Sequence, residues 1–482
     1  MNVLWGYVAS YGYLFAVIFV CGLLQKRNVL SGELSRKAIH ILIAFTWCLM
    51  DVFWGRSYHQ IIISSTFVII NFLSYKFKFL SGVERAGKSH AGTVYYALAM
   101  LVLSIASFLY EPLYYPFGAA VFVLSFGDGF APIFGSLKVG NKPLAGKKTL
   151  FGTMACFTFG AAALAVFSSS YELGLAPEEI IALGVLSSLI ELFSINGLDN
   201  FTVSFSVMAS VLAAYYDVFT QAFWICVSLS FIMVVAALYF NALTAIAAAV
   251  SEVFMIVSAY VCDWTVFLVY VLPFFIISIA GLMKRKKGKT SQGRKTRQVL
   301  INGAPALLGF LLFKIYADEA FFLLGAAALC SCFSDSCASD FGYFSNQTPY
   351  DFIKRKKVAK GLSGGITLLG SVACVLGAAV VAAISLINRP LSFVPLFVFA
   401  GGILGCFFDT VLGSLFQALY RYPIPKDPDE SGANEYGYSE TPVPYKNAVL
   451  IKGSKWVNND LVNLFSSVIA STSVFAIHML VF

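Results

Sequence analysis

Charged residues are scarce in this chain of 482 residues. Asp, Glu, Lys and Arg together make up 12% of the sequence, whereas soluble globular domains carry about 25%. Hydrophobic residues make up 59%. This composition excludes an ordinary soluble protein and predicts an integral membrane protein.

Cysteine patterns that bind zinc or build a disulfide framework are also missing. The ten cysteines lie mostly within apolar segments and form no CxxC pair. This distribution favours small packing residues, including Cys330, Cys332 and Cys337. The first apolar run, residues 5–24, lacks a basic n-region and a small-residue cleavage site. We therefore expect a retained span and a mature chain that begins at Met1.

Long apolar runs are what the sequence has in abundance. Runs of about 17 to 25 residues recur along the chain, and this is the length that a helix needs to cross a hydrocarbon core about 30 Å thick. Because a bilayer offers no water to backbone groups, such runs are helical. They predict an all-α polytopic membrane bundle of about sixteen transmembrane helices in two related halves.

The net charge of +8 is concentrated in alternate loops. The basic loops are residues 25–37, 76–88, 138–148, 284–297 and 354–360, and the loops between them are neutral or acidic. With about sixteen spans and an external N-terminus, every basic loop falls on the cytoplasmic side, as the positive-inside rule requires. Topology therefore accounts for most of these basic residues before any ligand is considered.

Composition also divides the chain into two parts, residues 1–217 and 218–482. Within the second part, the Lys-rich segment 284–297 predicts a cytosolic linker. The segment 420–455 is rich in Pro, Gly and charge, so we expect a cytosolic loop without a core of its own.

One pattern occurs in both parts of the chain. It consists of D-x-x-A-x-x-x-G, a basic loop and then K-x-x-x-G. The first copy comprises Asp128, Ala131, Gly135, Lys148 and Gly152, and the second comprises Asp335, Ala338, Gly342, Lys360 and Gly364. The shared order predicts two related sites that face the cytosol.

Several acidic residues fall near the predicted cytosolic ends of spans. An ionisable side chain at the bilayer centre costs roughly 2.5 to 3.5 kcal/mol, so it indicates a functional site. These acids are Asp128, Glu191, Asp335, Asp340 and Asp409, with Asp199 and Asp460 in or beside cytosolic loops. They gather at the face where nucleoside triphosphates and magnesium are present.

Carboxylates, glycines and lysines together at a membrane surface suggest phosphoryl transfer. Mg²⁺ commonly takes one or two carboxylates together with phosphate oxygens. Glycine lets backbone N–H groups approach a phosphate, and lysine supplies charge to the oxygens over which negative charge spreads. A further carboxylate can take the proton of an attacking hydroxyl.

The candidate residues follow from these roles. The candidate Mg²⁺ ligands are Asp128, Asp335 and Asp409, and with Asp199 and Asp340 they are also the candidate catalytic acids. The candidate phosphate or nucleotide ligands of the first half are Arg36, Lys37, His40, Gly127, Gly129, Gly135, Lys147, Lys148 and Gly152. Those of the second half are Lys360, Gly361, Ser363, Gly364 and Gly365, in a glycine-rich turn that enters a span and suits an anion. Further candidates are Glu191, Gln417, Asn459, Asp460 and Asn463, with Gln417 expected on the helical face of Asp409.

Plainer interpretations of these residues stay open. Gly127 and Gly135 also suit close helix packing. Lys147 and Lys148 also suit membrane topology. His40 also suits an interfacial position, and Asn459 also suits a helix cap.

Motifs in both halves resemble known families. The stretches SRKAIH (35–40), SFGDGFAPIFG (125–135), KKTLFGT (147–153) and ELFSINGLDNFTV (191–203) resemble the phytol kinase and dolichol kinase family of CTP-dependent polyprenol kinases. This resemblance implies that Asn200 contributes to nucleotide binding. The stretches GRKTRQVLING (293–303), SDSCASDFG (334–342), KGLSGGIT (360–367), FFDTVLGSLFQ (407–417) and NNDLVN (458–463) resemble the membrane family that contains phytyl-phosphate kinase.

The two resemblances together imply a fusion of consecutive kinases. The first kinase would phosphorylate a prenyl alcohol such as phytol or geranylgeraniol, and the second its monophosphate, for isoprenoid salvage. CTP or another nucleoside triphosphate would be the donor, Mg²⁺ the cofactor and the lipid bilayer the environment, with no nucleic acid partner. A membrane CTP-dependent cytidylyltransferase and a proton-coupled transporter or lipid-binding protein stay open as alternatives.

Overall fold

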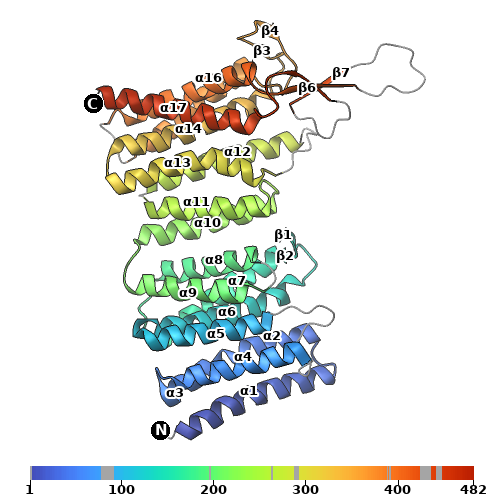
Figure 1. The fold of residues 1–482 in the computed structure, drawn as a ribbon, viewed down its shortest axis with the longest axis vertical. Helices are drawn as coiled ribbons and strands as arrows, with labels where there is room; N and C mark the ends of the chain where they lie inside the picture. The colour runs from blue at the N-terminus through green and yellow to red at the C-terminus, as the bar shows by residue number, and fades with distance from the viewer. Residues whose placement is uncertain are drawn as a thin grey trace, which may run out of the picture. The chain divides into compact units, whose positions relative to one another are not determined.

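A computed structural model of the protein describes residues 3–77, 92–194, 197–261, 264–286, 293–387, 389, 392–423, 436–440 and 448–481. Within these ranges, α-helices make up most of the structure, and short strands pair near some helix ends (Figure 1). The chain divides into two units, Met1–Val235 and Ala236–Phe482.

The first unit is a bundle of apolar helices joined by short connections. Its helices are α1 (Val3–Lys26), α2 (Gly32–Ile43), α3 (Phe45–Trp54), α4 (His59–Phe77), α5 (Gly92–Leu109), η1 (Glu111–Leu113), α6 (Tyr114–Gly135), α7 (Leu150–Ser170), α8 (Pro177–Phe193) and α9 (Asp199–Tyr215), and α10 (Gln221–Tyr239) runs across the boundary of the two units. An antiparallel hairpin of β1 (Pro143–Ala145) and β2 (Lys148–Thr149) lies between α6 and α7. The central helix is α6, which packs against α2, α5, α7, α8 and α9.

The second unit repeats this plan with larger connections. Its helices are α11 (Ala245–Val261), α12 (Trp264–Lys286), α13 (Thr296–Tyr316), α14 (Glu319–Gly342), α15 (Leu368–Ser385), α16 (Val394–Leu415) and α17 (Asn459–Val481). The central helix is α14, which packs against α12, α13, α15, α16 and α17. The core of this unit consists of apolar side chains from α11 to α17, among them Phe310, Phe322 and Leu323.

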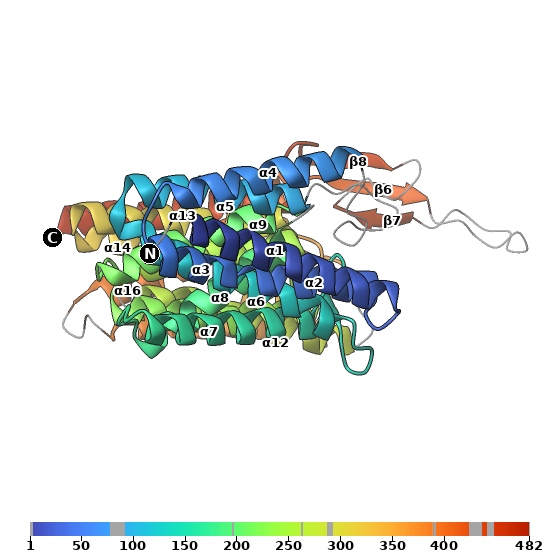
Figure 2. The ribbon, with the colours of Figure 1, turned by 90° about the horizontal axis from the view of Figure 1, so that it is seen from below.

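Two small antiparallel sheets lie in the connections of the second unit. The first contains β3 (Tyr350–Asp351), β4 (Lys356–Lys357) and β5 (Gly365–Ile366) in the order β4-β3-β5. The second contains β6 (Leu419–Pro423), β7 (Tyr436–Ser439) and β8 (Val449–Lys452) in the order β7-β6-β8. This second sheet lies beyond the ends of α16 and α17 (Figure 1), and Figure 2 shows its strands β6, β7 and β8 together.

The helices have the length and composition of a membrane protein. In the described residues, eleven helical segments are long and apolar enough to span a bilayer, and three shorter helices are apolar as well. Many large apolar side chains on these helices are exposed, as expected where helices meet lipid tails. The prediction of an all-α polytopic membrane protein is confirmed, and the count of about sixteen spans stays a prediction.

The helices α7 and α15 begin in the same way. The hydroxyl of Thr149 precedes α7 and accepts a hydrogen bond from the Gly152 N–H at 3.3 Å. The hydroxyl of Thr367 precedes α15 and accepts from the Gly370 N–H at 3.1 Å. Each threonine therefore caps its helix and satisfies a backbone donor that the first turn leaves free.

These two glycines also make equivalent packing contacts. A Cβ at Gly152 would lie 3.0 Å from the Ala131 carbonyl oxygen, and a Cβ at Gly370 would lie 2.9 Å from the Ala338 carbonyl oxygen. Glycine thus allows α7 to cross α6, and α15 to cross α14, at close range. The repeat of D-x-x-A-x-x-x-G therefore has a structural basis in both units.

The predicted second part of that repeat is wrong. It paired Lys148–Gly152 with Lys360–Gly364, but the caps and contacts above make Gly370 the equivalent of Gly152. The position equivalent to Lys148 is therefore Ile366. The glycine-rich turn that contains Lys360 is an additional feature of the second unit.

Three further expectations about connections need correction. Segment 420–455 was expected to be a loop without a core of its own, and its described parts form the strands β6, β7 and β8; residues 424–435 and 441–447 lie outside the described residues. The predicted linker 284–297 is shorter, because α12 continues to Lys286 and α13 begins at Thr296, and residues 287–292 lie outside the described residues. Gln417 is not on the helical face of Asp409, because α16 ends at Leu415.

Candidate functional site

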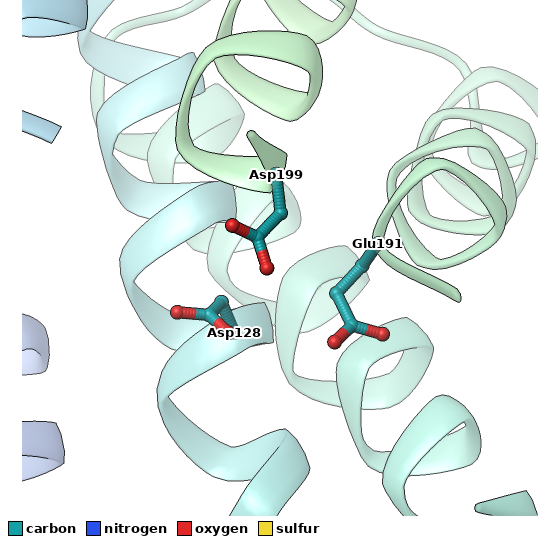
Figure 3. Close-up of side chains that lie close together, drawn as sticks. All are labelled: Asp128, Glu191 and Asp199. Carbon is teal, nitrogen blue, oxygen red and sulfur yellow. The ribbon is translucent and has the colours of Figure 1, made fainter. Parts of the chain in front are cut away.

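Three acidic side chains meet at one end of the first unit. Asp128 lies two turns before the end of α6, Glu191 lies in the last turn of α8, and Asp199 is the first residue of α9. One oxygen from each carboxylate lies within 4.8 Å of the others. The three side chains point toward one another (Figure 3). All three are acids that the sequence predicted, and the fold brings them together although Glu191 and Asp199 lie more than sixty residues after Asp128.

Two lysines neutralise most of this negative charge. The Lys37 ammonium, from α2, donates to Asp128 Oδ2 at 2.7 Å and to the Asp128 carbonyl oxygen at 2.8 Å. The Lys148 ammonium, from β2, donates to Glu191 and lies 3.7 Å from Asp199 Oδ2. With three carboxylates and two ammonium groups, the cluster keeps one net negative charge.

Electrostatics hold Lys148 in its charged form. Burial alone would lower the pKa of the Lys148 ammonium, but the carboxylates of Glu191 and Asp199 outweigh burial and raise that pKa above its ordinary value. An ammonium group that stays protonated can bind a phosphate oxygen as well as a carboxylate. The Lys148 side chain is 31% exposed and that of Lys37 only 3%, so Lys148 is the ammonium group of this cluster that an anion can reach.

The other basic candidates of the first half lie around this cluster in different ways. His40 Nε2 lies 3.4 Å from Asp128 Oδ2, and its ring packs on Tyr96 with 4.7 Å between ring centroids. The Arg36 guanidinium instead pairs with Glu33 on its own helix at 2.6 Å. Lys147 is exposed, next to the half-buried Lys148.

The candidate glycines of the first half lie in helix contacts. A Cβ at Gly127 would lie 3.1 Å from Cys156 Sγ, and a Cβ at Gly129 would lie 2.4 Å from Ile41. Gly135 and Gly152 lie against each other where α6 meets α7. Close packing accounts for all four positions, and a role in phosphate binding stays a prediction.

Asn200 organises the backbone at the start of α9. Its side-chain amide donates to the Gly197 carbonyl oxygen at 3.1 Å, and its backbone N–H donates to Asp199 Oδ1 at 3.1 Å. Asn200 is buried. Its position fixes the carboxylate of Asp199, and its predicted nucleotide role stays untested.

The three carboxylates fit a divalent cation. Carboxylate oxygens are the ligands that Mg²⁺ prefers in proteins, and in the described residues only Asp128, Glu191 and Asp199 form a group of three such donors. The sequence predicted Asp128 as a metal ligand but not Glu191 or Asp199. The signal that was available is their placement at the same predicted ends of spans.

The second unit brings two acids to the equivalent end of its bundle. A Cβ at Gly405 would lie 1.8 Å from Ser331 Oγ, so α14 and α16 touch at this point. Asp335 follows Ser331 by one helical turn, and Asp409 follows Gly405 by one turn. Because α14 and α16 run in the same direction, both acids lie just beyond this contact.

Asp409 is held by polar groups from α17. The Asn463 amide donates to Asp409 Oδ2 and to the Asn459 carbonyl oxygen, both at 3.0 Å. Ser466 Oγ lies 3.5 Å from Asp409 Oδ2. The predicted residues Asn459 and Asn463 are thus brought to Asp409, whereas Asp460 pairs with Arg297 at 3.1 Å.

Asp340 is separate from this pair. The Lys284 ammonium donates to Asp340 Oδ1 at 2.5 Å, and the Arg294 guanidinium lies 3.7 Å from Asp340 Oδ2. These contacts tie the ends of α12 and α14 to the segment that precedes α13. The sequence did not predict Lys284 as a site residue, because a lysine at a span end is equally expected from topology.

The glycine-rich turn is held by the carboxylate of the residue that directly follows β7. Glu440 accepts from the Ser363 backbone N–H at 2.6 Å and from the Gln417 side-chain amide at 2.7 Å. The Lys360 ammonium donates to the Ser345 carbonyl oxygen. Sequence analysis missed Glu440, because no pattern around it marks an interaction with a turn 77 residues earlier.

The remaining glycines of this turn serve its conformation and packing. Gly361 and Gly364 have φ angles of +87° and +88°, which L side chains rarely adopt. A Cβ at Gly364 would also lie 2.7 Å from Ser414, and one at Gly365 would lie 2.7 Å from Val358. Their predicted role in phosphate binding stays a prediction.

Comparison with known proteins gives this geometry a family context. Residues 228–471 match the family described as integral membrane protein DUF92. An uncharacterized membrane protein of Methanocaldococcus jannaschii is 29% identical over 172 residues, which are 35% of this chain and 71% of that protein.

Two phytol kinases are also similar to this chain. The phytol kinase of Synechocystis sp. is 27% identical over 201 residues, which are 40% of this chain and 83% of that enzyme. The chloroplastic phytol kinase 1 of Arabidopsis thaliana is 27% identical over 234 residues, which are 43% of this chain and 74% of that enzyme. No solved structure shows significant similarity.

Proposed function

We propose, from the premise that this chain belongs to the integral membrane family DUF92, that it is a membrane kinase of prenyl lipids with two sites. The first unit phosphorylates a prenyl alcohol to its monophosphate, and the second unit phosphorylates the monophosphate to the diphosphate. CTP or another nucleoside triphosphate is the donor, and both sites face the cytoplasm. The products serve isoprenoid salvage.

The observation that carries the first step is the cluster of Asp128, Glu191 and Asp199 with Lys37 and Lys148. Acids and lysines in contact at the ends of apolar helices suit a substrate whose chain lies in the bilayer and whose hydroxyl lies at the interface. The similarity to two phytol kinases supports a prenyl alcohol as this substrate.

The residues of the cluster divide the chemistry of this step among them. The hydroxyl oxygen of the prenol attacks the γ-phosphorus and forms an O–P bond. The bond from this phosphorus to the β-phosphate oxygen breaks, and the nucleoside diphosphate leaves. Asp199 takes the hydroxyl proton. The ammonium group nearest to its carboxylate, that of Lys148, lies 3.7 Å away, farther than the ammonium groups that contact Asp128 and Glu191. Lys148 stabilises the charge that spreads over the phosphoryl oxygens.

Lys37 and the three carboxylates set up the site for the nucleotide. Lys37 is almost fully buried and fixes Asp128 through two hydrogen bonds. Asp128 and Glu191 would hold Mg²⁺, which when bound neutralises charge on the phosphate oxygens of the donor, and Asp199 stays available as the base. In the second unit, Asp335 and Asp409 would hold it.

The second step is assigned to the second unit because that unit repeats the plan of the first. The acids Asp335 and Asp409 occupy the ends of α14 and α16, as Asp128 and Glu191 occupy the ends of α6 and α8. The glycine-rich turn around Ser363 lies just before the start of α15, a helix end where an anion is favoured, and the Glu440 carboxylate accepts from the Ser363 N–H there.

The test uses membranes that contain the full chain. Phytol, farnesol and geranylgeraniol are each offered with each γ-labelled nucleoside triphosphate, and the monophosphate and diphosphate products are resolved. We expect Asp128→Asn to abolish monophosphate formation from the alcohol while the variant still converts added monophosphate. We expect Asp335→Asn to accumulate monophosphate. Glu111→Gln, an exposed acid before the opposite end of α6, should change neither step.

The same experiment separates the proposal from other functions. Label that enters lipid from α-labelled CTP would show cytidylyl transfer instead. Loss of both steps in either aspartate variant would contradict the assignment of one step to each unit. Wild-type membranes that leave every prenol unlabelled would refute the kinase itself.

A further inference from the structure

The second unit contains an apolar cavity next to its acidic site. The cavity has a volume of about 110 Å³ and lies among α11, α12, α13 and α14. Phe254, Met255, Tyr270, Leu329 and Phe333 form much of its wall. No step assigned above uses this space.

Polar groups gather in one part of the cavity lining. They come from Arg294, Gln298, Asn302 and Ser336. The side chain of Asn302 has a buried Oδ1 atom that lacks a hydrogen-bond partner in the described residues. A buried acceptor without a donor is costly and uncommon in a folded protein. The polar part of the cavity therefore suits a ligand whose head carries a hydrogen-bond donor, such as the remaining O–H of a singly protonated phosphate.

The charge near this part favours an anionic head. The Arg294 guanidinium shares the Asp340 carboxylate with the Lys284 ammonium, so two cations face one anion. The distance from Arg294 to Asp340 is 3.7 Å, and 34% of the Arg294 side chain is exposed. Its remaining N–H donors can bind a phosphate in the planar, two-point arrangement that guanidinium groups favour.

The position of Ser336 connects the cavity to the acids. Ser336 lines the cavity and directly follows Asp335 on α14. A ligand whose head contacts Arg294 and Asn302 therefore has that head at the same helix end as Asp335. Its apolar tail would lie against Phe254, Met255 and Leu329.

The size of the cavity limits what fits. An apolar cavity of about 150 Å³ binds benzene, a six-carbon ring. A cavity of about 110 Å³ therefore accommodates roughly one five-carbon isoprene unit and leaves the rest of a long chain to the bilayer. Because lipid tails are as apolar as this wall, shape and the anionic head, rather than the hydrophobic effect, determine what binds.

We propose that this cavity binds the head-proximal isoprene unit of a prenyl monophosphate, with the phosphate at Arg294 and Asn302. The inference rests on the proposed second step, because it assigns the substrate site of that step. Arg294 and Asn302 are then ligands of the phosphate, and Met255 is part of the apolar wall that selects the isoprene unit.

The direct test is a photolabelling experiment that does not require turnover. A prenyl monophosphate with a diazirine on its first isoprene unit is bound to the full chain, irradiated and mapped by mass spectrometry. We expect labelled peptides from α11 and α14 that include Met255 or Leu329, with labelling suppressed by excess unlabelled prenyl monophosphate but not by the prenol. Labelling confined to other helices would overturn the inference.

A matched pair of variants tests the same site through kinetics. Met255 is buried in the cavity wall, whereas Val253, two residues earlier on α11, is 56% exposed. We expect Met255→Trp to lower kcat/KM for the prenyl monophosphate at least tenfold, and Val253→Trp to leave it unchanged. Both variants should retain wild-type conversion of the prenol to the monophosphate, which controls for expression and for the first unit, and thermal unfolding of each variant serves as the control for folding of the second unit.

The outcomes distinguish the two proposals. Mapped labelling in the cavity without any kinase activity would uphold the binding site and refute the proposed function. Wild-type activity with equal kinetics in both tryptophan variants would uphold the kinase and refute the cavity as its substrate site.

Discussion

Replacing Lys148 with methionine removes the ammonium group between Glu191 and Asp199 and keeps a side chain of similar length. Lys37 would then face the acid cluster alone, through its contact with Asp128. Carboxylate oxygens within 4.8 Å of each other repel by at least about 3.5 kcal/mol at an effective dielectric constant of about 20. Lys148→Met leaves this repulsion between Glu191 and Asp199 without compensation.

Two measurable consequences follow from this repulsion. The unfolding temperature of the variant should fall in the absence of a divalent cation, because removal of one partner leaves buried charge unpaired. Addition of Mg²⁺ should raise that temperature more in the variant than in the wild type, since less positive charge competes for the carboxylates. The kcat/KM of monophosphate formation should fall on the order of 100-fold, because about 3 kcal/mol of transition-state stabilisation is lost.

The adjacent lysine provides the control. Lys147 is exposed and has the same charge, so Lys147→Met changes the net charge of the connection without touching the acids. Thermal unfolding with and without Mg²⁺, and initial rates with γ-labelled nucleotide, would be measured for both variants. Equal unfolding shifts and equal rates in the two variants would refute the assignment of Lys148 to the acid cluster.

Two further predictions concern the second unit. Gly405→Ala places a methyl group 1.8 Å from Ser331 Oγ. It should therefore destabilise the second unit by about 1 to 3 kcal/mol in denaturant unfolding and reduce diphosphate formation only. Gly281→Ala, with nothing within 4 Å of its Cβ, is the control, and equal unfolding of the two variants would contradict the α14–α16 contact. Lys452 donates to the Gly413 carbonyl oxygen, and burial together with a nearby lysine lowers its pKa from 10.5 to about 8. Between these two pKa values the unfolded chain holds a proton that the folded chain has lost, so the unfolding free energy should rise with pH across this window. Lys452→Met should remove that rise when unfolding is followed from pH 7.5 to 10.5. A pH profile that is the same in the variant and the wild type would refute the pKa shift.

The helices and the first acid cluster could be predicted from sequence because both depend on simple constraints. Apolar runs of membrane length must be helical in lipid, so the all-α class follows from composition. Successive spans alternate in direction, so the ends of α6 and α8 and the start of α9 fall on the same side. Asp128, Glu191 and Asp199 were therefore expected at one face, although not within 4.8 Å of each other.

The pairing of side chains could not be predicted in the same way. Nothing near Lys37 in sequence indicates a contact with Asp128, 91 residues later, because the contact depends on how α2 packs against α6. Likewise, Lys147 and Lys148 are equal in composition, and only the β1–β2 hairpin decides that Lys148 faces the acids. Single-sequence patterns do not contain this tertiary information.

The short strands and the glycines show a second limit. The strands β6 to β8 come from a segment rich in Pro, Gly and charge, and their stability depends on pairing with one another and on the contact of Glu440 with the turn at Ser363. Gly152 fits both a phosphate-binding and a packing pattern in sequence. Only its approach to the Ala131 carbonyl oxygen shows that packing requires it.

The distribution of charge within the two sites supports the proposed order of the steps. The first site has three carboxylates and two lysines, and its proposed acceptor, a prenol, is neutral. A monophosphate carries a charge of about −1.5 to −2 near neutral pH, so a site for it needs positive charge beside the phosphate. The second unit has two acids where the first has three, with Asp409 held by neutral Asn463 and Ser466 rather than by lysine. Lys284 and Arg294 share the Asp340 carboxylate, so the three side chains together carry one net positive charge. Arg294 lines the cavity proposed for the substrate, where this charge would offset part of the repulsion between the acids and an anionic acceptor.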